Sequence, residues 1–169
     1  MSNSHSIKSD QMHRLQTTQW VIERQLGWIA AADTKVAVVI AIDTAMVAAL
    51  AAAYTSAKVI VPWAAAMSVG AAFLVVIAMA CAAMSLLPRT SGPQCSLLFF
   101  GTIAQSPAAD YVVAITTSTN DQLQADFAMQ AHRNAEIAAT KHGWVRRSIA
   151  WSFLAGIPWV FAVGFLVRQ

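Results

Sequence analysis

The chain has 169 residues, of which 57% are hydrophobic and only 11% are charged. Soluble domains average about 25% charged residues, so this composition excludes an ordinary soluble domain and predicts a membrane protein. The net charge of +3 comes from Lys and Arg residues that flank apolar segments. Because these cations form no dense basic patch, we expect no nucleic-acid partner.

Residues 1–35 are polar, and they predict a cytoplasmic N-terminal arm followed by an amphipathic helix. The helix is expected to begin near Ser9 or Asp10, since either side chain can cap a helix. The arm lacks the short apolar core and small-residue cleavage site of a signal peptide. We therefore expect the protein to insert through its own helices.

Residues 36–57 predict the first transmembrane helix. These 22 residues carry one charge, Asp43, and at ~1.5 Å per residue they reach about 33 Å, the thickness of a bilayer's hydrocarbon core. Small residues recur at every fourth position, the spacing that lets membrane helices approach closely: Ala37, Ala41, Ala45, Ala49, Ala53 and Ala57. A second stripe, at alternating steps of three and four, begins well before the span and indicates a coiled-coil-like packing seam: Leu15, Gln19, Ile22, Leu26, Ile29, Asp33, Val36, Ile40, Asp43, Val47, Leu50 and Tyr54.

Two further apolar segments, residues 59–87 and residues 149–167, predict the second and third transmembrane helices. The turn before residue 59 is short, so the first two helices should form an antiparallel hairpin. With three spans, nine Lys and Arg residues fall on the side of the N-terminus and long loop, and two on the other side. The positive-inside rule then predicts a cytoplasmic N-terminus and a periplasmic C-terminus.

Residues 88–148 predict a cytoplasmic loop and helices. The segment 89–107 is punctuated by Gly and Pro and is expected to be irregular. It contains an apolar run at residues 97–100, which forms either a plug under the cytoplasmic helices or the wall or gate of a ligand site.

Pro107 predicts the start of a short helix, and Ser118 or Thr119 predicts the cap of a long helix that continues into the third span. Half of the long helix's seam is polar: Leu123, Phe127, Gln130, Asn134, Ile137 and Lys141. Ordinary bundle seams are more apolar, so this face is either wet or lines a polar cavity.

Motifs for catalysis are absent from the sequence, which contains no Gly-rich phosphate loop, HExxH or CxxC. We therefore predict no catalytic residue and no enzymatic activity. The four histidines are scattered outside the apolar segments, so no metal site is predicted. Cys81 and Cys95 are expected to be reduced and unpaired.

Asp43 is the most informative single residue. An aspartate inside a membrane helix costs ~2.5 kcal/mol or more if it faces lipid, so such residues usually face a bundle or water. Asp43 is thus either a hydrogen-bonded contact between helices or a polar element of a pore or oligomer contact.

Acidic and basic residues are also predicted to lie at the same level, just on the cytoplasmic side of the transmembrane helices. Asp33 and Arg147 are expected to form a structural ion pair, as both lie about one turn below the first and third spans. The alternative is a group of cations facing a negatively charged ligand, with Arg133, Lys141 and Arg146 as candidates.

The order of LGWIAAADTK, two spans, LLFFGTIAQSPAADYV, HRNAEIAATKHGWVRRSIAW and a last span resembles the transmembrane effectors of the Pycsar antiphage systems. The resemblance covers residues ~20–167. It implies a bacterial inner-membrane protein that is encoded beside a pyrimidine cyclase. It also implies activation by cyclic UMP or cyclic CMP, followed by loss of membrane integrity and death of the infected cell.

We therefore predict an all-α membrane protein with three transmembrane helices whose cytoplasmic extensions form a small bundle. The preferred function is a nucleotide-gated antiphage effector that causes abortive infection as a homo-oligomer in contact with membrane lipid, without a cofactor. A constitutive scaffold or an ungated holin-like pore is the alternative. A cyclic mononucleotide offers a phosphate, a base edge and a ribose, which a Lys or Arg, an Asn or Gln and an aromatic wall would bind. The candidate ligand-binding residues are Phe100, Gln130, Arg133, Asn134, Lys141 and Arg146.

Overall fold

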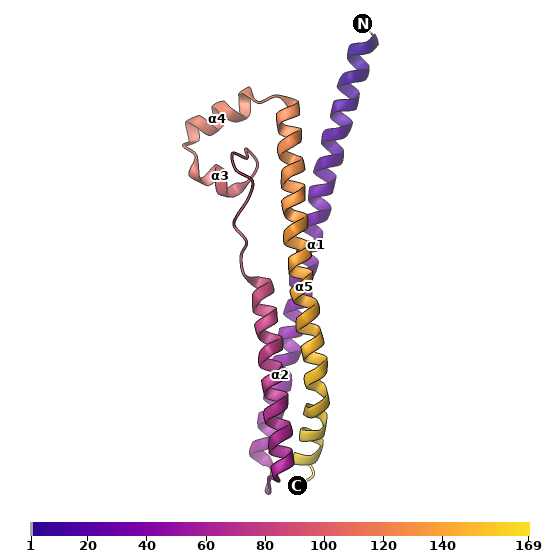
Figure 1. Ribbon diagram of the computed structural model, residues 1–169, viewed down its shortest axis with the longest axis vertical. Helices are drawn as coiled ribbons and strands as arrows, with labels where there is room; N and C mark the ends of the chain where they lie inside the picture. Colours follow the sequence, from indigo (N-terminus) through magenta and orange to yellow (C-terminus); the bar gives the residue numbers. More distant parts are fainter. Residues whose placement is uncertain (1) are drawn as a thin grey trace. The chain divides into compact units, whose positions relative to one another are not determined.

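The computed structural model describes residues 2–169, with side chains from Ser9 onward. Within these residues the secondary structure is entirely helical (Figure 1), which confirms the predicted all-α class. The helices are α1 (Ser2–Ser56), α2 (Pro62–Leu86), α3 (Phe100–Gln105), α4 (Ala108–Thr117) and α5 (Asn120–Leu166). The long helices α1, α2 and α5 are each long and apolar enough to cross a membrane.

The chain forms two compact units. The membrane unit comprises Ala31–Leu87 and Thr140–Gln169, and the loop unit comprises Met1–Ala30 and Pro88–Ala139. Helices α1 and α5 each contribute residues to both units, because each helix runs without a break from its loop-unit residues into its membrane-unit residues. The prediction that α1 begins near Ser9 or Asp10 was wrong: the helix begins at Ser2, since no proline or glycine precedes Gly27 to end it.

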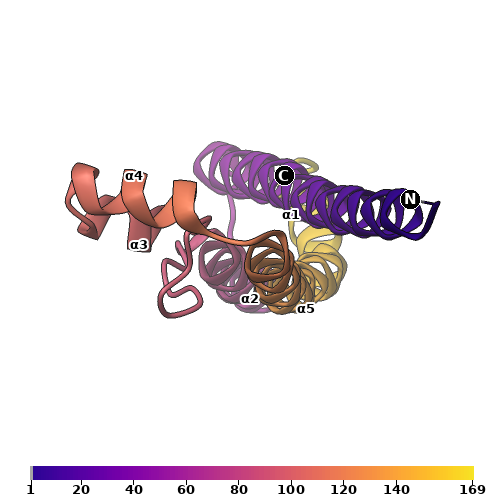
Figure 2. The same ribbon diagram turned by 90° about the horizontal axis from the view of Figure 1, so that it is seen from above.

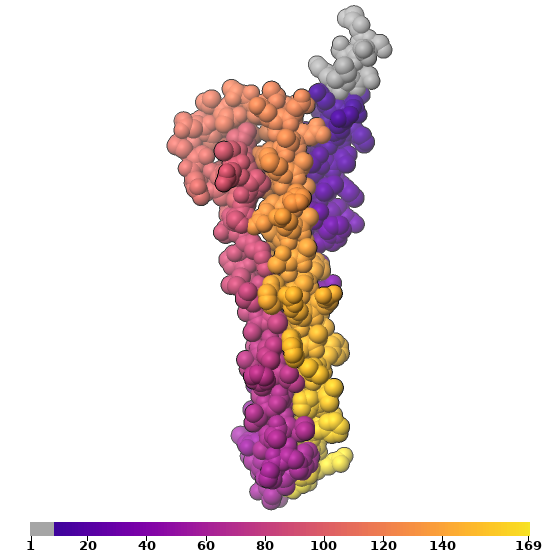
Figure 3. All heavy atoms as spheres, in the orientation of Figure 1, coloured from indigo at the N-terminus to yellow at the C-terminus, as the bar shows by residue number. Residues whose placement is uncertain are grey.

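In the membrane unit, α2 lies beside the parts of α1 and α5 that belong to this unit (Figures 1 and 2). Two clusters form its core. One contains Ala32, Val36, Ala82 and Val145. The other contains Leu50, Ala53, Ala64, Ala71, Ala162 and Leu166. Alanines make up half of the first cluster and four of the six residues of the second. Small residues allow the atoms of α2 and the membrane part of α5 to meet closely (Figure 3).

The predicted seam of α1 is correct at every seventh residue, where Val36, Asp43 and Leu50 are buried. It is wrong at four other positions, which are exposed: Gln19, Leu26, Val47 and Tyr54. The intervening Ile40 is half-buried and packs against the core. The buried intervening positions lie one residue earlier, for example at Val39 and Ala53. Ala53 packs in the alanine-rich cluster with α2 and α5, where the ring of Tyr54 would be too large.

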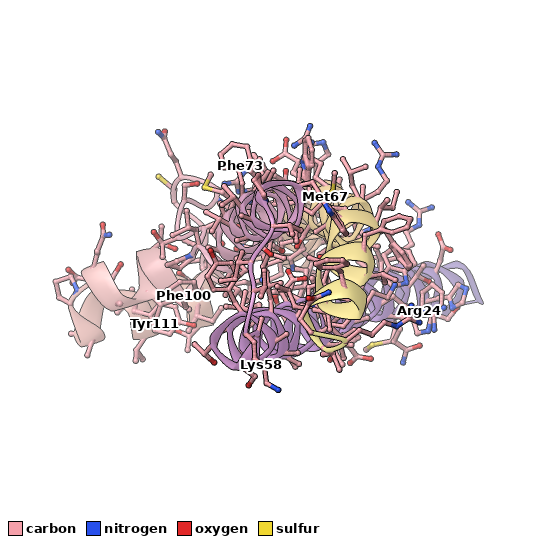
Figure 4. The ribbon with its side chains drawn as sticks, turned by 90° about the horizontal axis from the view of Figure 1, so that it is seen from below. Arg24, Lys58, Met67, Phe73, Phe100 and Tyr111 are labelled. Atoms are coloured by element: carbon pink, nitrogen blue, oxygen red, sulfur yellow. The ribbon has the colours of Figure 1, made fainter. Side chains whose placement is uncertain are left out.

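Large apolar side chains cover the outside of the membrane unit. On α2, Phe73 is 64% exposed and lies on the outer side of the helix (Figure 4), and Met67 is 40% exposed. Such a surface is unfavourable in water and suits a hydrocarbon environment.

In the loop unit, α4 and the start of α5 agree with the sequence. Thr119 caps α5 in a reciprocal capping box: the Thr119 N–H donates to Gln122 Oε1 at 2.8 Å, and the Gln122 N–H donates to Thr119 Oγ1 at 3.3 Å. Helix α3 was not expected, since the segment around Gly101 was predicted to be irregular. Gly101 lies in the first turn of α3, where the absence of a side chain makes room for the Phe99 ring, 2.6 Å from the point that a Cβ would occupy.

Candidate functional site

Asp43 lies at the centre of the membrane unit with an exposed fraction of 0%. Its Oδ2 accepts a hydrogen bond from the Ser152 hydroxyl on α5 at 3.1 Å. Its Oδ1 has no hydrogen-bond partner among the described residues. The prediction that Asp43 faces the bundle is confirmed, and half of this carboxyl group is available for a further partner.

Two more hydrogen bonds fasten α5 to its neighbours at membrane depth. The Ser148 hydroxyl donates to the Ala78 carbonyl on α2 at 2.8 Å. The Trp159 indole N–H donates to the Met46 carbonyl on α1, also at 2.8 Å. These bonds satisfy polar groups that would be costly to bury alone in hydrocarbon.

Asp33 forms an ion pair with Lys141, whose Nζ lies 2.5 Å from Asp33 Oδ1. The predicted pairing of Asp33 with Arg147 was therefore wrong, and Arg147 instead lies over the Trp144 ring at 4.7 Å. The error came from aligning the first residues of the two spans. That alignment pairs residue 36 of α1 with residue 149 of α5. The observed contacts pair Asp33 with Lys141 and Asp43 with Ser152, which are 108 and 109 positions apart in the sequence. Helix α5 is therefore shifted along α1 by about one turn relative to the predicted alignment.

In the loop unit, Ser96 is a buried hydrogen-bond centre. Its hydroxyl oxygen accepts from the backbone N–H of Leu98 at 3.1 Å and of Phe99 at 2.9 Å, and from the Gln130 amide at 2.9 Å. The adjacent Leu97 N–H donates to Asp126 Oδ2 at 2.7 Å. Two side chains of α5 thus hold the loop before α3: Asp126 binds its backbone, and Gln130 binds the Ser96 hydroxyl.

Arg133 fastens the same loop at an earlier point. Its Nε donates to the Ser91 carbonyl at 2.8 Å, and its Nη1 donates to Glu136 Oε2 at 2.9 Å. The hydrogen bond from Arg133 lowers the pKa of the exposed Glu136 carboxyl. Arg133 therefore already has partners on the loop and on its own helix.

An open pocket of about 420 Å³ lies beside Asp126, between α4, the loop and α5. Its walls combine polar and apolar groups: Cys95, Leu97, Ala114, Thr117, Ser118, Gln122, Asp126 and Met129. A second pocket of about 390 Å³ shares Cys95, Leu97 and Ala114 and extends toward Tyr111. Figure 4 shows Tyr111 and Phe100 on the α3–α4 side of the loop unit.

The six candidate ligand-binding residues are distributed over both units. Phe100, Gln130, Arg133 and Asn134 belong to the loop unit, whereas Lys141 and Arg146 belong to the membrane unit. Gln130 and Arg133 converge on one loop, whereas Phe100 is 62% exposed and its ring contacts Phe99. Their role in nucleotide binding stays a prediction.

Sequence reasoning missed Ser96 and Asp126. A signal was present for Asp126, because it precedes Gln130 by four residues and so shares its face of α5. Along the half-polar seam, Gln130 is buried and the other five side chains are half-buried. No cluster of three metal-ligating side chains occurs in the part of the chain that the structure describes.

A family model for the Pycsar effector protein domain matches residues 17–168, which include most of both units. The chain belongs to the Pycsar effector family. A Pycsar effector protein from Propioniciclava tarda is 36% identical over 90 residues, a match that covers 47% of this chain and 45% of that relative. This chain thus spans less than half the length of the relative. No solved structure is significantly similar to it.

Proposed function

We propose that this Pycsar effector is an antiphage defence protein of the bacterial inner membrane. A cyclic pyrimidine mononucleotide, cyclic UMP or cyclic CMP, made by an adjacent pyrimidine cyclase, activates it. The active protein impairs the membrane and kills the infected cell before the phage matures. The observation that carries the proposal is the family match over residues 17–168, which covers the membrane helices and the pocket-bearing loop unit together.

We propose that membrane damage involves more than one copy of the chain, since the three membrane helices pack closely on an apolar core within one bundle. Homo-oligomerisation is supported by the alanine stripe of α1. Ala37, Ala41, Ala45 and Ala49 are exposed in the single chain, and they offer the close-contact surface that a second membrane helix prefers.

The connection between ligand and membrane is α5. This helix runs from Asn120 to Leu166 without interruption, so no flexible linker separates its loop-unit part from its membrane part. A ligand shifts an equilibrium only if it binds the active arrangement more tightly. A ~100-fold preference would supply about 2.7 kcal/mol, enough to convert a mostly inactive population to a mixed one.

Growth of bacteria that express the chain tests this function against its alternatives. The proposal predicts killing only when an active pyrimidine cyclase is co-expressed, and survival with a catalytically inactive cyclase. A holin-like pore would kill in both strains, and a constitutive scaffold would kill in neither. The nucleotide should be recovered unchanged, since the effector acts without an enzymatic step.

A further inference from the structure

One carboxylate oxygen in the loop unit lacks a partner. Asp126 is only 5% exposed, and its Oδ2 is held by the Leu97 N–H at 2.7 Å. Its Oδ1 is buried and accepts no hydrogen bond from the described residues. A buried carboxylate oxygen without a donor is costly, and such a group in a pocket wall indicates a missing partner.

The composition of the pocket defines what that partner can be. Among its lining residues Asp126 carries the only ionisable oxygen, and neither Lys nor Arg contributes to the wall. An anion such as phosphate would meet the wrong sign of charge there. A neutral group that donates N–H would satisfy Asp126, and the NH2 group of the Gln122 amide can donate to a carbonyl oxygen. The hydroxyls of Thr117 and Ser118 already donate to the Val113 and Ile115 carbonyls, so toward a ligand they can only accept.

The apolar part of the pocket wall suits the face of an aromatic ring. Leu97 and Met129 contribute apolar surface on the loop and on α5, respectively. The volume of about 420 Å³ falls in the range of small-molecule sites. Uracil carries an N3–H donor, and cytosine carries an N4 amino donor, each next to ring carbonyl or ring nitrogen acceptors.

We propose that this pocket holds the pyrimidine base of the activating nucleotide, with Asp126 accepting a hydrogen bond from the base. The proposal rests on the proposed function, which supplies the ligand class. It also explains how binding of the base could change the contact between the loop and α5. Asp126 and Leu97 line the pocket and bind each other, so base binding acts on the contact that holds the loop to α5.

Cys95 provides a built-in reporter, because it is exposed and lines the pocket, whereas Cys81 is buried in the membrane unit. The full chain, with Cys81→Ala, is placed in lipid nanodiscs and labelled with a maleimide. Cyclic UMP or cyclic CMP should slow labelling of Cys95 at least threefold. The nucleosides uridine and cytidine, which lack the phosphate, should protect at higher concentration.

Asp126→Asn keeps the side-chain volume and an oxygen for Leu97, but it removes the charged acceptor. The nucleotide concentration for half-protection should rise 10-fold or more. Asp121→Asn, an exposed control on the same helix outside the pocket lining, should leave it unchanged. Ala114→Phe fills the pocket without removing the Asp126–Leu97 bond, so labelling of Cys95 should be slower without nucleotide and should no longer respond to added nucleotide.

Wild-type dose dependence in both Asp126→Asn and Ala114→Phe would overturn the proposal. Dye release from liposomes, measured on the same samples, separates the two ideas. Nucleotide-dependent release without Cys95 protection would reject this pocket and keep the gated function. Protection that depends on Asp126, without any release, would keep the pocket and reject the gated function.

Discussion

The Asp33–Lys141 ion pair yields an asymmetric prediction about stability. The Lys141 side chain is 13% exposed and the Asp33 side chain is 40% exposed. Removing Asp33 strands an ammonium group that has little access to water, whereas removing the charge of Lys141 leaves a carboxylate that water can reach. We expect Asp33→Ala to lower the free energy of unfolding by about 2 kcal/mol, between the values for exposed and fully buried pairs.

Lys141→Met, which keeps most of the apolar stem, should cost less than about 1 kcal/mol because solvent screens the remaining Asp33. The double variant should be less destabilised than the sum of the two single variants. Unfolding by dodecyl sulfate in mixed micelles, followed by far-UV circular dichroism, provides the three values. A larger loss for Lys141→Met than for Asp33→Ala, or strict additivity, would refute the pairing and restore Lys141 as a free candidate cation.

Three further predictions concern the membrane segment, the loop unit and the topology. Asp43→Leu should insert at least as well as the wild type, because it removes a carboxyl group whose cost in a membrane helix is ~2.5 kcal/mol; reduced membrane abundance in a fractionation assay would contradict this. Arg133→Gln should raise the pKa of Glu136 toward its ordinary value in an NMR titration. Since the folded-state pKa is depressed, this pair stabilises above the unfolded pKa, and its contribution is lost as the pH falls through the folded pKa. A reporter fused at Gln169 should read periplasmic and one inserted at Gln94 cytoplasmic, and agreement between the two would exclude the three-span topology.

The long helices were predictable because their signals are local. The lengths of the apolar segments predict α2 and the membrane parts of α1 and α5. Thr119 marks the start of α5, because its side chain and the Gln122 side chain cap the helix. The burial of Asp43 was predictable for a related reason, since a charge within an apolar helix has few favourable places to lie.

The parts that sequence reasoning missed depend on contacts between distant segments. The register of α5 against α1 is set by how alanines and hydroxyls pack, and the polarity of each span does not contain that information. The placement of the loop before α3 depends on its Leu97 N–H meeting Asp126 and on its Ser96 hydroxyl meeting the Gln130 amide, both on α5. An irregular segment gives no periodic pattern from which such pairings can be read.

Release of a trapped dye from proteoliposomes tests the central claim most directly. Purified chain is reconstituted into dye-loaded vesicles, and cyclic UMP and cyclic CMP are titrated separately, with linear UMP and CMP as controls. The account predicts no release without nucleotide and saturable release with at least one cyclic pyrimidine nucleotide, but none with the linear nucleotides. Equal release with and without cyclic nucleotide, or no release at any concentration, would contradict it.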